Sequence, residues 1–284
     1  METIRLDTTT GDGRRIALWR SRIHDSSGGP VVVLCPGFGR QMTDLVTVAH
    51  YLCTNGATVY RMDPLDHVGL SDGTIFDYTP SASALSLQAV LGFVHRAERG
   101  QPVVVVAASM AARPAVRVAL EGSIDRLVTV VGVVNMRRTI AAVFGDAIVA
   151  MPRAELPRSV WFENLEVGPH GIYDDQRFGW WDLEVTRAEL ECLAVPTTAI
   201  FADGDPWVDA DDVRLAFGES GHPNRRLVSI HSSTHDLGQD ATAGLIALEA
   251  ITAAALDSTA VRVPTLEALV ASIHSEANLE AVPA

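Results

Sequence analysis

The chain has 284 residues, of which 22 are basic and 35 acidic, so its formal net charge is −13. Every basic residue is arginine, and the absence of lysine excludes a Schiff-base lysine, a lysine general base and the lysine of a phosphate-binding loop. The negative charge argues against nucleic acid as the main partner, because phosphate binding needs a basic surface. An anionic protein partner would need a local cluster of arginines, which net charge does not exclude.

Hydrophobic residues make up 48% of the chain, which is enough to bury a sizeable core. The cysteines, Cys35, Cys53 and Cys192, lack the spacing of a zinc site, and the N-terminus lacks the apolar core of a signal peptide. No apolar stretch approaches the roughly 18 residues that span a bilayer. We therefore expect a cytoplasmic protein without membrane insertion, metal or cofactor; the oligomeric state stays open.

Strand and helix patterns alternate along most of the chain. Residues 2–24 are typical of two strands around a Gly11-Asp12-Gly13 turn. Short apolar runs predict further strands at residues 31–35, 57–63, 103–107, 127–134, 197–201 and 227–231. Helical patterns lie between them. One follows the first of these strands and ends near Asn55, and the others cover residues 80–99, 111–120, 209–217 and 241–256. This alternation predicts an α/β fold whose mostly parallel sheet is flanked by helices on both faces.

One long interruption, residues 136–192, breaks the alternation. It carries six of the chain's thirteen phenylalanine and tryptophan residues: Phe144, Trp161, Phe162, Phe178, Trp180 and Trp181. A connection this long inside a compact domain is commonly a lid. We therefore predict a core of residues 1–135 and 193–260, an inserted cap of residues 136–192, and a C-terminal tail of residues 261–284 that adds at most a short helix.

The most informative segment runs from residue 103 to residue 112. An apolar strand leads directly into Ser109 and a helix begins immediately afterwards, which is typical of a nucleophile elbow. The sharp turn needs small residues two positions before and after the serine, and Ala107 and Ala111 meet that need. The amide of Met110 would then donate to an oxyanion. The alternative is that Ser109 only caps a helix.

A serine nucleophile needs a base and an acid that orients the base. His235 lies in the loop after the last predicted strand, from which it can reach the elbow; His231 is the second choice. For the acid we choose Asp205 over Asp203, because an aspartate followed three residues later by an apolar residue, just before a helix, is the usual hydrolase arrangement. Ser109, Asp205 and His235 follow one another in the chain order of α/β-hydrolases.

The turn Gly37-Phe38-Gly39 follows the first buried strand, where α/β-hydrolases place their second oxyanion donor. It is no dinucleotide-binding fingerprint, because the third glycine is missing at Met42. We choose the amide of Phe38 as the donor, with Gly39 as the alternative. We expect the substrate pocket to be lined by Gly37, Gly39, His67, Trp161, Trp180, Trp181 and Trp207.

Blocks of sequence spread between about residues 30 and 240 resemble the acyltransferases of bacterial bioluminescence, a family of acyl-carrier-protein thioesterases. The blocks are residues 37–42, 51–56, 66–71, 107–113, 132–135 and 233–238. The alanine-flanked elbow and the block around His67 are more specific than the general hydrolase pattern. The resemblance implies an α/β-hydrolase fold with Ser109 as nucleophile, His235 as base and Asp205 as acid. It also implies a thioester substrate and a cap that forms an acyl tunnel.

The cap and the tail from Val261 resemble the family least. The length of the acyl chain and the acyl acceptor that the family uses therefore do not carry over to this protein. Our leading hypothesis is a serine thioesterase or acyltransferase that cleaves fatty or polyketide acyl chains from acyl carrier protein through an acyl-serine intermediate. A carboxylester hydrolase, or an acyltransferase or cyclase that releases an ester or lactone, would use the same triad. A protein that only binds a hydrophobic ligand is a further alternative, against which the intact Ser, Asp and His argue.

Overall fold

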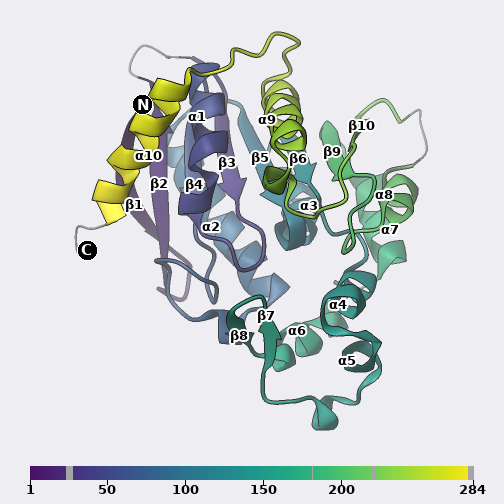
Figure 1. Ribbon diagram of the computed structural model, residues 1–284. Helices are drawn as coiled ribbons and strands as arrows, with labels where there is room; N and C mark the ends of the chain where they lie inside the picture. Colours follow the sequence, from purple (N-terminus) through teal and green to yellow (C-terminus); the bar gives the residue numbers. More distant parts are fainter. Residues whose placement is uncertain (24–27, 181, 219–221, 281–284) are drawn as a thin grey trace.

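The computed structural model describes residues 1–23, 28–180, 182–218 and 222–280. Its centre is an eight-stranded sheet of order β1-β2-β4-β3-β5-β6-β9-β10 (Figure 1). The first two strands, β1 (Glu2–Thr9) and β2 (Arg15–Arg22), form the predicted antiparallel hairpin at one edge. The remaining strands are parallel to one another: β3 (Val31–Cys35), β4 (Thr58–Met62), β5 (Val103–Ala108), β6 (Arg126–Val130), β9 (Thr197–Ala202) and β10 (Arg225–Ile230).

The continuous apolar runs form the middle of this sheet because both of its faces are covered. Side chains alternate between the two faces of a strand. In β5, Val103 and Val105 belong to one hydrophobic cluster, whereas Val104 and Val106 belong to the other. A strand that alternated between polar and apolar residues would leave one of these clusters incomplete.

Helices α1 (Val46–Thr54) and α9 (Ala241–Leu256) pack on one face, and α2 (Pro80–Ala97), α3 (Ala112–Ala119) and α8 (Ala210–Phe217) pack on the other. The tail forms a longer helix than expected, α10 (Leu266–Glu280), which lies against α1. Glu276 of α10 forms a buried ion pair with Arg61 of β4 at 2.6 Å. Strand β6 is shorter than predicted, because the chain turns at Val131, whose φ is +43°.

The chain between β6 and β9 leaves the sheet. It forms α4 (Met136–Phe144), α5 (Asp146–Ala150), the hairpin β7 (Val160–Phe162) and β8 (Leu165–Val167), α6 (Pro169–Asp175) and α7 (Leu183–Cys192). Figure 1 shows β7, β8 and α4 to α6 gathered beyond one end of the sheet. The predicted fold class is confirmed. Within the described residues, no helix combines the length and the apolar character that crossing a membrane requires.

Candidate active site

Ser109 stands at the sharp turn between β5 and α3. Its φ of +50° lies in the left-handed region, which costs a non-glycine residue about 1–3 kcal/mol and is common at functional sites. The turn is crowded: a Cβ on Gly37 would lie 3.0 Å from the Cβ of Ser109. The flanking Ala107 and Ala111 are buried. The local geometry is therefore that of a nucleophile elbow, as the sequence predicts.

His235 and Asp205 complete a chain of hydrogen bonds that begins at this serine. The Ser109 hydroxyl lies 2.8 Å from His235 Nε2, and His235 Nδ1 lies 2.7 Å from an Asp205 carboxylate oxygen. With its proton on Nδ1, the ring donates to Asp205 and accepts from the serine hydroxyl. This arrangement can draw a proton from Ser109 and stabilise the resulting imidazolium.

The Asp205 carboxylate is held from both sides. One oxygen accepts the backbone N–H groups of Trp207 and Val208, at 2.8 and 3.0 Å, and the other meets His235. The ring of Trp207 lies 4.8 Å from that of His235 and covers it. The acid loop and the base loop also join directly, because Gly204 N–H donates to the carbonyl of Ser232 at 2.9 Å. Asp205, the acid chosen from the sequence, is thus a buried acceptor held in a fixed orientation.

The rival residues form a pair of their own. Asp203 accepts from the Ser232 N–H and lies 3.0 Å from His231 Nδ1, and the side chain of His231 is fully exposed. This contact raises the pKa of His231 and lowers that of Asp203, in each case chiefly through their hydrogen bond. No bond between this pair and Ser109 is present among the described residues.

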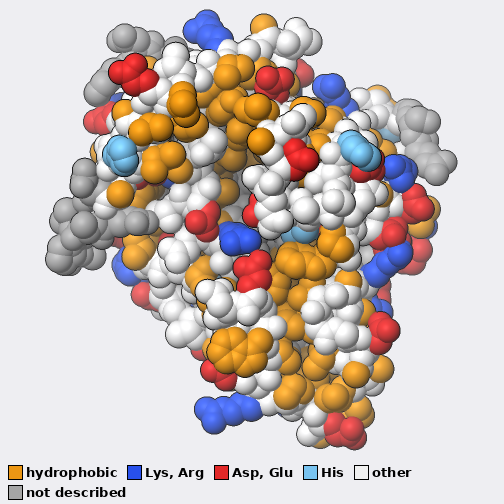
Figure 2. Space-filling view, viewed as in Figure 1, with side chains coloured by type: hydrophobic (Ala, Val, Ile, Leu, Met, Phe, Trp, Pro, Cys, Tyr) orange, Lys and Arg blue, Asp and Glu red, His pale blue; other side chains and the backbone are white. Residues whose placement is uncertain are grey.

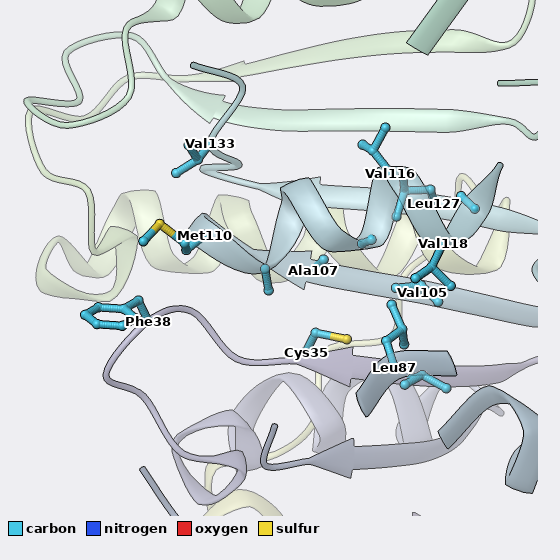
Figure 3. Close-up of a cluster of buried hydrophobic side chains, with 14 of the residues drawn as sticks. Cys35, Phe38, Leu87, Val105, Ala107, Met110, Val116, Val118, Leu127 and Val133 are labelled. Carbon is cyan, nitrogen blue, oxygen red and sulfur yellow. The ribbon is translucent and has the colours of Figure 1, made fainter. Parts of the chain in front are cut away.

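The two predicted oxyanion donors lie at the same end of the sheet. Figure 3 shows Phe38 and Met110 together where β3 and β5 end. The alternative donor, the Gly39 amide, is already used, because it donates to His67 Nε2 at 3.1 Å. Among the bonds of the described residues, none engages the Phe38 N–H. The Phe38 N–H therefore fits the role of second oxyanion donor better than the Gly39 N–H does.

The predicted pocket residues separate into two groups. Gly37 lies against Ser109 and Trp207 against His235, whereas Gly39 and His67 bond to each other in and beside the turn that contains Gly37. Trp161 does not join them, because it is 67% exposed on β7; Trp181 lies outside the described residues.

Trp180 is not part of this cluster either. Its ring stacks on the Arg117 guanidinium at 3.8 Å, and its indole N–H donates to Ser81 Oγ. Arg113 and Arg117 both pair with Glu189 of α7. Trp180 therefore fastens the inserted segment to α2 and α3, which is a structural role that aromatic content alone could not reveal.

Phe162 is the residue of the site that sequence reasoning missed. Its ring packs against Phe38 at 5.1 Å and Trp207 at 5.7 Å, and it lies over Gly39, where a Cβ would come within 3.0 Å of it. Neighbouring strand residues face opposite sides, and Trp161 is exposed where Phe162 is buried, but a strand of three residues is too short for the sequence to show which of the two faces inward.

Comparisons with known proteins identify the family of this chain. The chain matches the profile of the family described as acyl transferase over residues 3–276. It is 33% identical to an acyl transferase of Vibrio campbellii over 234 residues, which cover 81% of this chain and 76% of that protein. It is also 33% identical to one from Aliivibrio fischeri over 250 residues, 86% of this chain and 80% of that protein. The predicted resemblance is confirmed.

Solved structures agree on the fold. Est1E from Butyrivibrio proteoclasticus, with ferulic acid bound, superposes with a TM-score of 0.71 at 16% identity, over 88% of this chain and 99% of that one. An α/β serine hydrolase homologue from Coxiella burnetii gives a TM-score of 0.59 at 15% identity, over 92% and 99%. The chain is thus an enzyme of acyl transfer or hydrolysis on an α/β-hydrolase fold, and it belongs to the acyl transferase family.

Proposed function

We propose that this enzyme is a serine thioesterase or acyltransferase that removes an acyl chain from acyl carrier protein. The observation that carries the proposal is the unbroken chain of hydrogen bonds from Ser109 through His235 to Asp205. This chain supports a nucleophilic serine with a base and an orienting acid. Membership of the acyl transferase family supports an acyl-thioester substrate.

The reaction proceeds in two steps. His235 takes the hydroxyl proton as Ser109 Oγ attacks the thioester carbonyl, and the carbonyl oxygen becomes an oxyanion that accepts from the Phe38 and Met110 amides. The C–S bond then breaks, the thiolate of the carrier leaves with the proton from His235, and an acyl-serine remains. Water, or an alcohol in a transferase, attacks this ester under the same base and regenerates Ser109. Asp205 holds the required tautomer of His235 throughout.

We propose that the insertion, residues 136–192, acts as the cap and receives the acyl chain. A small apolar cavity of about 20 Å³ lies within it, which the cap would have to widen for an acyl chain, and its lining includes Ile140, Phe144, Ile148, Val160 and Val167. Phe162 packs 6.2 Å from Phe144 and 5.1 Å from Phe38, so its ring lies between the cavity and the oxyanion turn. Figure 2 shows hydrophobic side chains gathered at the same end of the molecule. An apolar lining favours a hydrocarbon chain over a polar acyl group.

Intact-protein mass spectrometry tests the proposal. Wild type and Ser109→Ala are mixed with a panel of acyl-carrier-protein and acyl-pantetheine thioesters, and both the protein mass and the released acid are followed. We expect a mass increase of one acyl group, or free acid without a lasting adduct, in the wild type only. Ser109→Ala that keeps more than about a tenth of the wild-type rate would overturn the role of the serine.

A carboxylester hydrolase is the second candidate, because the same three residues attack oxygen esters. Rates on matched thioester and ester substrates separate the two functions: a preference for the ester would move the assignment to an esterase. Analysis of the product released from the carrier-bound chain separates hydrolysis from transfer, since a transferase or cyclase yields an ester or lactone in place of free acid.

A further inference from the structure

His67 belongs to a sequence block that the proposed mechanism leaves unexplained. The side chain is 5% exposed, and its ring makes edge contacts with Phe38 at 5.8 Å and Tyr78 at 5.5 Å between ring centres. We propose that His67 is a positioning residue: as a neutral acceptor of the Gly39 N–H, it holds the oxyanion turn in the conformation that aims the Phe38 amide at the reacting carbonyl. This inference rests on the proposed function.

The turn itself has the marks of a type II β-turn from Gly37 to Arg40. The Arg40 N–H donates to the carbonyl of Gly37 at 3.0 Å, and Gly39 at the third position has a φ of +77°. A type II turn differs from a type I turn by a flip of its central peptide, here the one between Phe38 and Gly39. In this structure the N–H of that peptide faces His67 Nε2 at 3.1 Å. An acceptor at that position therefore favours the type II form.

The peptide that His67 anchors adjoins the candidate oxyanion donor. The Gly37 carbonyl and the Phe38 N–H share one planar trans peptide, so they point in opposite directions. With the carbonyl tied to Arg40, the Phe38 N–H points out of the turn, and Gly37 places this peptide against Ser109. The next peptide plane shares the Phe38 Cα, so anchoring its Gly39 N–H on His67 also restrains the position of the Phe38 amide.

His67 acts as an acceptor because its ring stays neutral. Burial lowers its pKa to about 4, and only a weaker contribution from the Val68 backbone opposes this shift. Since Nε2 accepts from Gly39, the ring proton lies on Nδ1, which has a weak contact with the Val68 backbone but no well-formed hydrogen bond in the described part of the chain. An unpaired buried donor costs about 1–3 kcal/mol, a cost that an apolar residue of the same size would avoid. The histidine is therefore poorly explained by packing alone.

The loop that carries His67 is itself braced against the turn. The carboxylate of Asp63 accepts the Met42 N–H at 2.7 Å and the Leu70 N–H at 2.8 Å, so it joins the two segments. Gly69 leaves the space that this carboxylate fills, because a Cβ there would lie 2.1 Å from an Asp63 oxygen. The loop thus supports the turn at two positions, Gly39 and Met42, which accounts for a compact and specific sequence block.

Two variants of nearly equal size separate the hydrogen bond from the packing. His67→Gln keeps an acceptor within reach of the Gly39 N–H, whereas His67→Met fills the same space without a strong acceptor. The kinetic constants kcat and KM are measured on an acyl-pantetheine thioester, and affinity is measured for an alkyl boronic acid, which forms a tetrahedral anion on the serine. For His67→Met we expect kcat and boronate affinity to fall about 10- to 100-fold, less than the roughly 10²–10³ for losing an oxyanion donor outright. KM should stay within about twofold, and His67→Gln should recover most of the loss.

His50 provides the matched control. His50 is also buried, but its ring bonds to Ser272 of α10. It belongs to α1, which covers the face of the sheet opposite to the hydrophobic cluster that contains Phe38. His50→Gln and His50→Met should lower Tm without changing kcat.

Equal kcat in His67→Gln and His67→Met, or a His67→Met protein that loses only Tm, would overturn the positioning role while leaving the proposed function in place. A wild type that binds the boronate but cleaves no thioester would overturn the thioesterase assignment, and the boronate affinities of the variants would still test the turn. A wild type that neither binds boronate nor cleaves thioesters would overturn both.

Discussion

Two aspartate–histidine pairs occupy neighbouring loops after β9 and β10, and among the described residues only one of them bonds to the Ser109 hydroxyl. Asp205 and His235 lie 2.7 Å apart, with side chains 0% and 10% exposed. Asp203 and His231 lie 3.0 Å apart, with side chains 37% and 100% exposed. Both pairs have the hydrogen bond that a catalytic dyad needs. What distinguishes them is burial and the presence of Ser109 on the far side of the ring.

Burial changes what the same contact can do. In a water-excluded site the carboxylate interacts with a developing imidazolium far more strongly than it does at the surface, where solvent and salt screen the charges. Asp205 also accepts from the Trp207 and Val208 amides, so it is oriented before any reaction begins. An exposed pair such as Asp203 and His231 contributes little to stability and has no reacting group to act on.

Replacing each histidine by alanine gives the largest predicted contrast. His235→Ala should lower kcat by about 10⁴- to 10⁶-fold, because it removes the group that takes the proton from Ser109. His231→Ala should leave kcat within about twofold, since no bond joins its ring to the serine. Steady-state turnover of one acyl-pantetheine substrate measures both. A large loss in His231→Ala would reverse the assignment.

The aspartates should repeat this contrast on a smaller scale. In Asp205→Asn the amide group can donate to Nδ1, which favours the tautomer whose Nε2 carries a proton and cannot accept from Ser109. We expect kcat to fall by about 10³- to 10⁴-fold. Asp203→Asn should retain wild-type kcat and serves as the control. Comparable losses in the two variants would mean that the loop, and not the Asp205 carboxylate, carries the effect.

The sequence was sufficient to predict the main features of this arrangement. Short apolar runs gave the parallel strands, because strands buried on both faces need no polar alternation. The order of Ser109, Asp205 and His235 followed from where each stands relative to a strand end. The choice between Asp203 and Asp205 came from a comparison with other hydrolases, since two residues in one loop cannot be separated by periodicity.

The insertion was less predictable for physical reasons. Its strands β7 and β8 span three residues each, too few for a periodic pattern to establish which side faces inward. Trp180 lies against α3 because of long-range contacts with Arg113 and Arg117, and the residues next to Trp180 in the sequence do not predict these contacts. The position of α10 likewise depends on Glu276 meeting Arg61, a pairing across 215 positions of the chain.

Gly204 joins the two loops, so its substitution disturbs both pairs at once. A Cβ at this position would lie 2.9 Å from the carbonyl of Ser232, which also accepts the Gly204 N–H. Gly204→Ala should therefore separate the loops, lower stability by about 1–3 kcal/mol and reduce kcat about tenfold by displacing Asp205 from His235. Gly11→Ala, which has open space around it, is the control. Denaturant unfolding measures the loss of stability, and steady-state kinetics measures the loss of kcat. An unchanged kcat would show that the contact between Asp205 and His235 survives the separation of the two loops.

The smallest effect lies in the titration of the exposed pair. The hydrogen bond that the His231 ring donates to Asp203 raises the pKa of His231 above 6.5, and the same bond lowers the pKa of Asp203 below 3.8. The raised histidine contributes stability that is complete below its unfolded pKa and is lost as pH rises through its folded pKa. The lowered aspartate contributes stability that is present above its unfolded pKa and is lost as pH falls through its folded pKa. The pair therefore stabilises the fold only between these limits, and slightly, because both groups are open to solvent.

NMR titration of the His231 ring reads this pair directly. In Asp203→Asn the pKa of His231 should return toward 6.5, while kcat measured over the same pH range stays that of the wild type. If the pKa of His231 did not move, the pair would not persist in water, and an aspartate beside a histidine at this sheet edge would be stable only where the fold buries it. That result would strengthen the argument from burial, because the hydrogen bond between Asp205 and His235 would then depend on the Trp207 ring and the backbone donors around it.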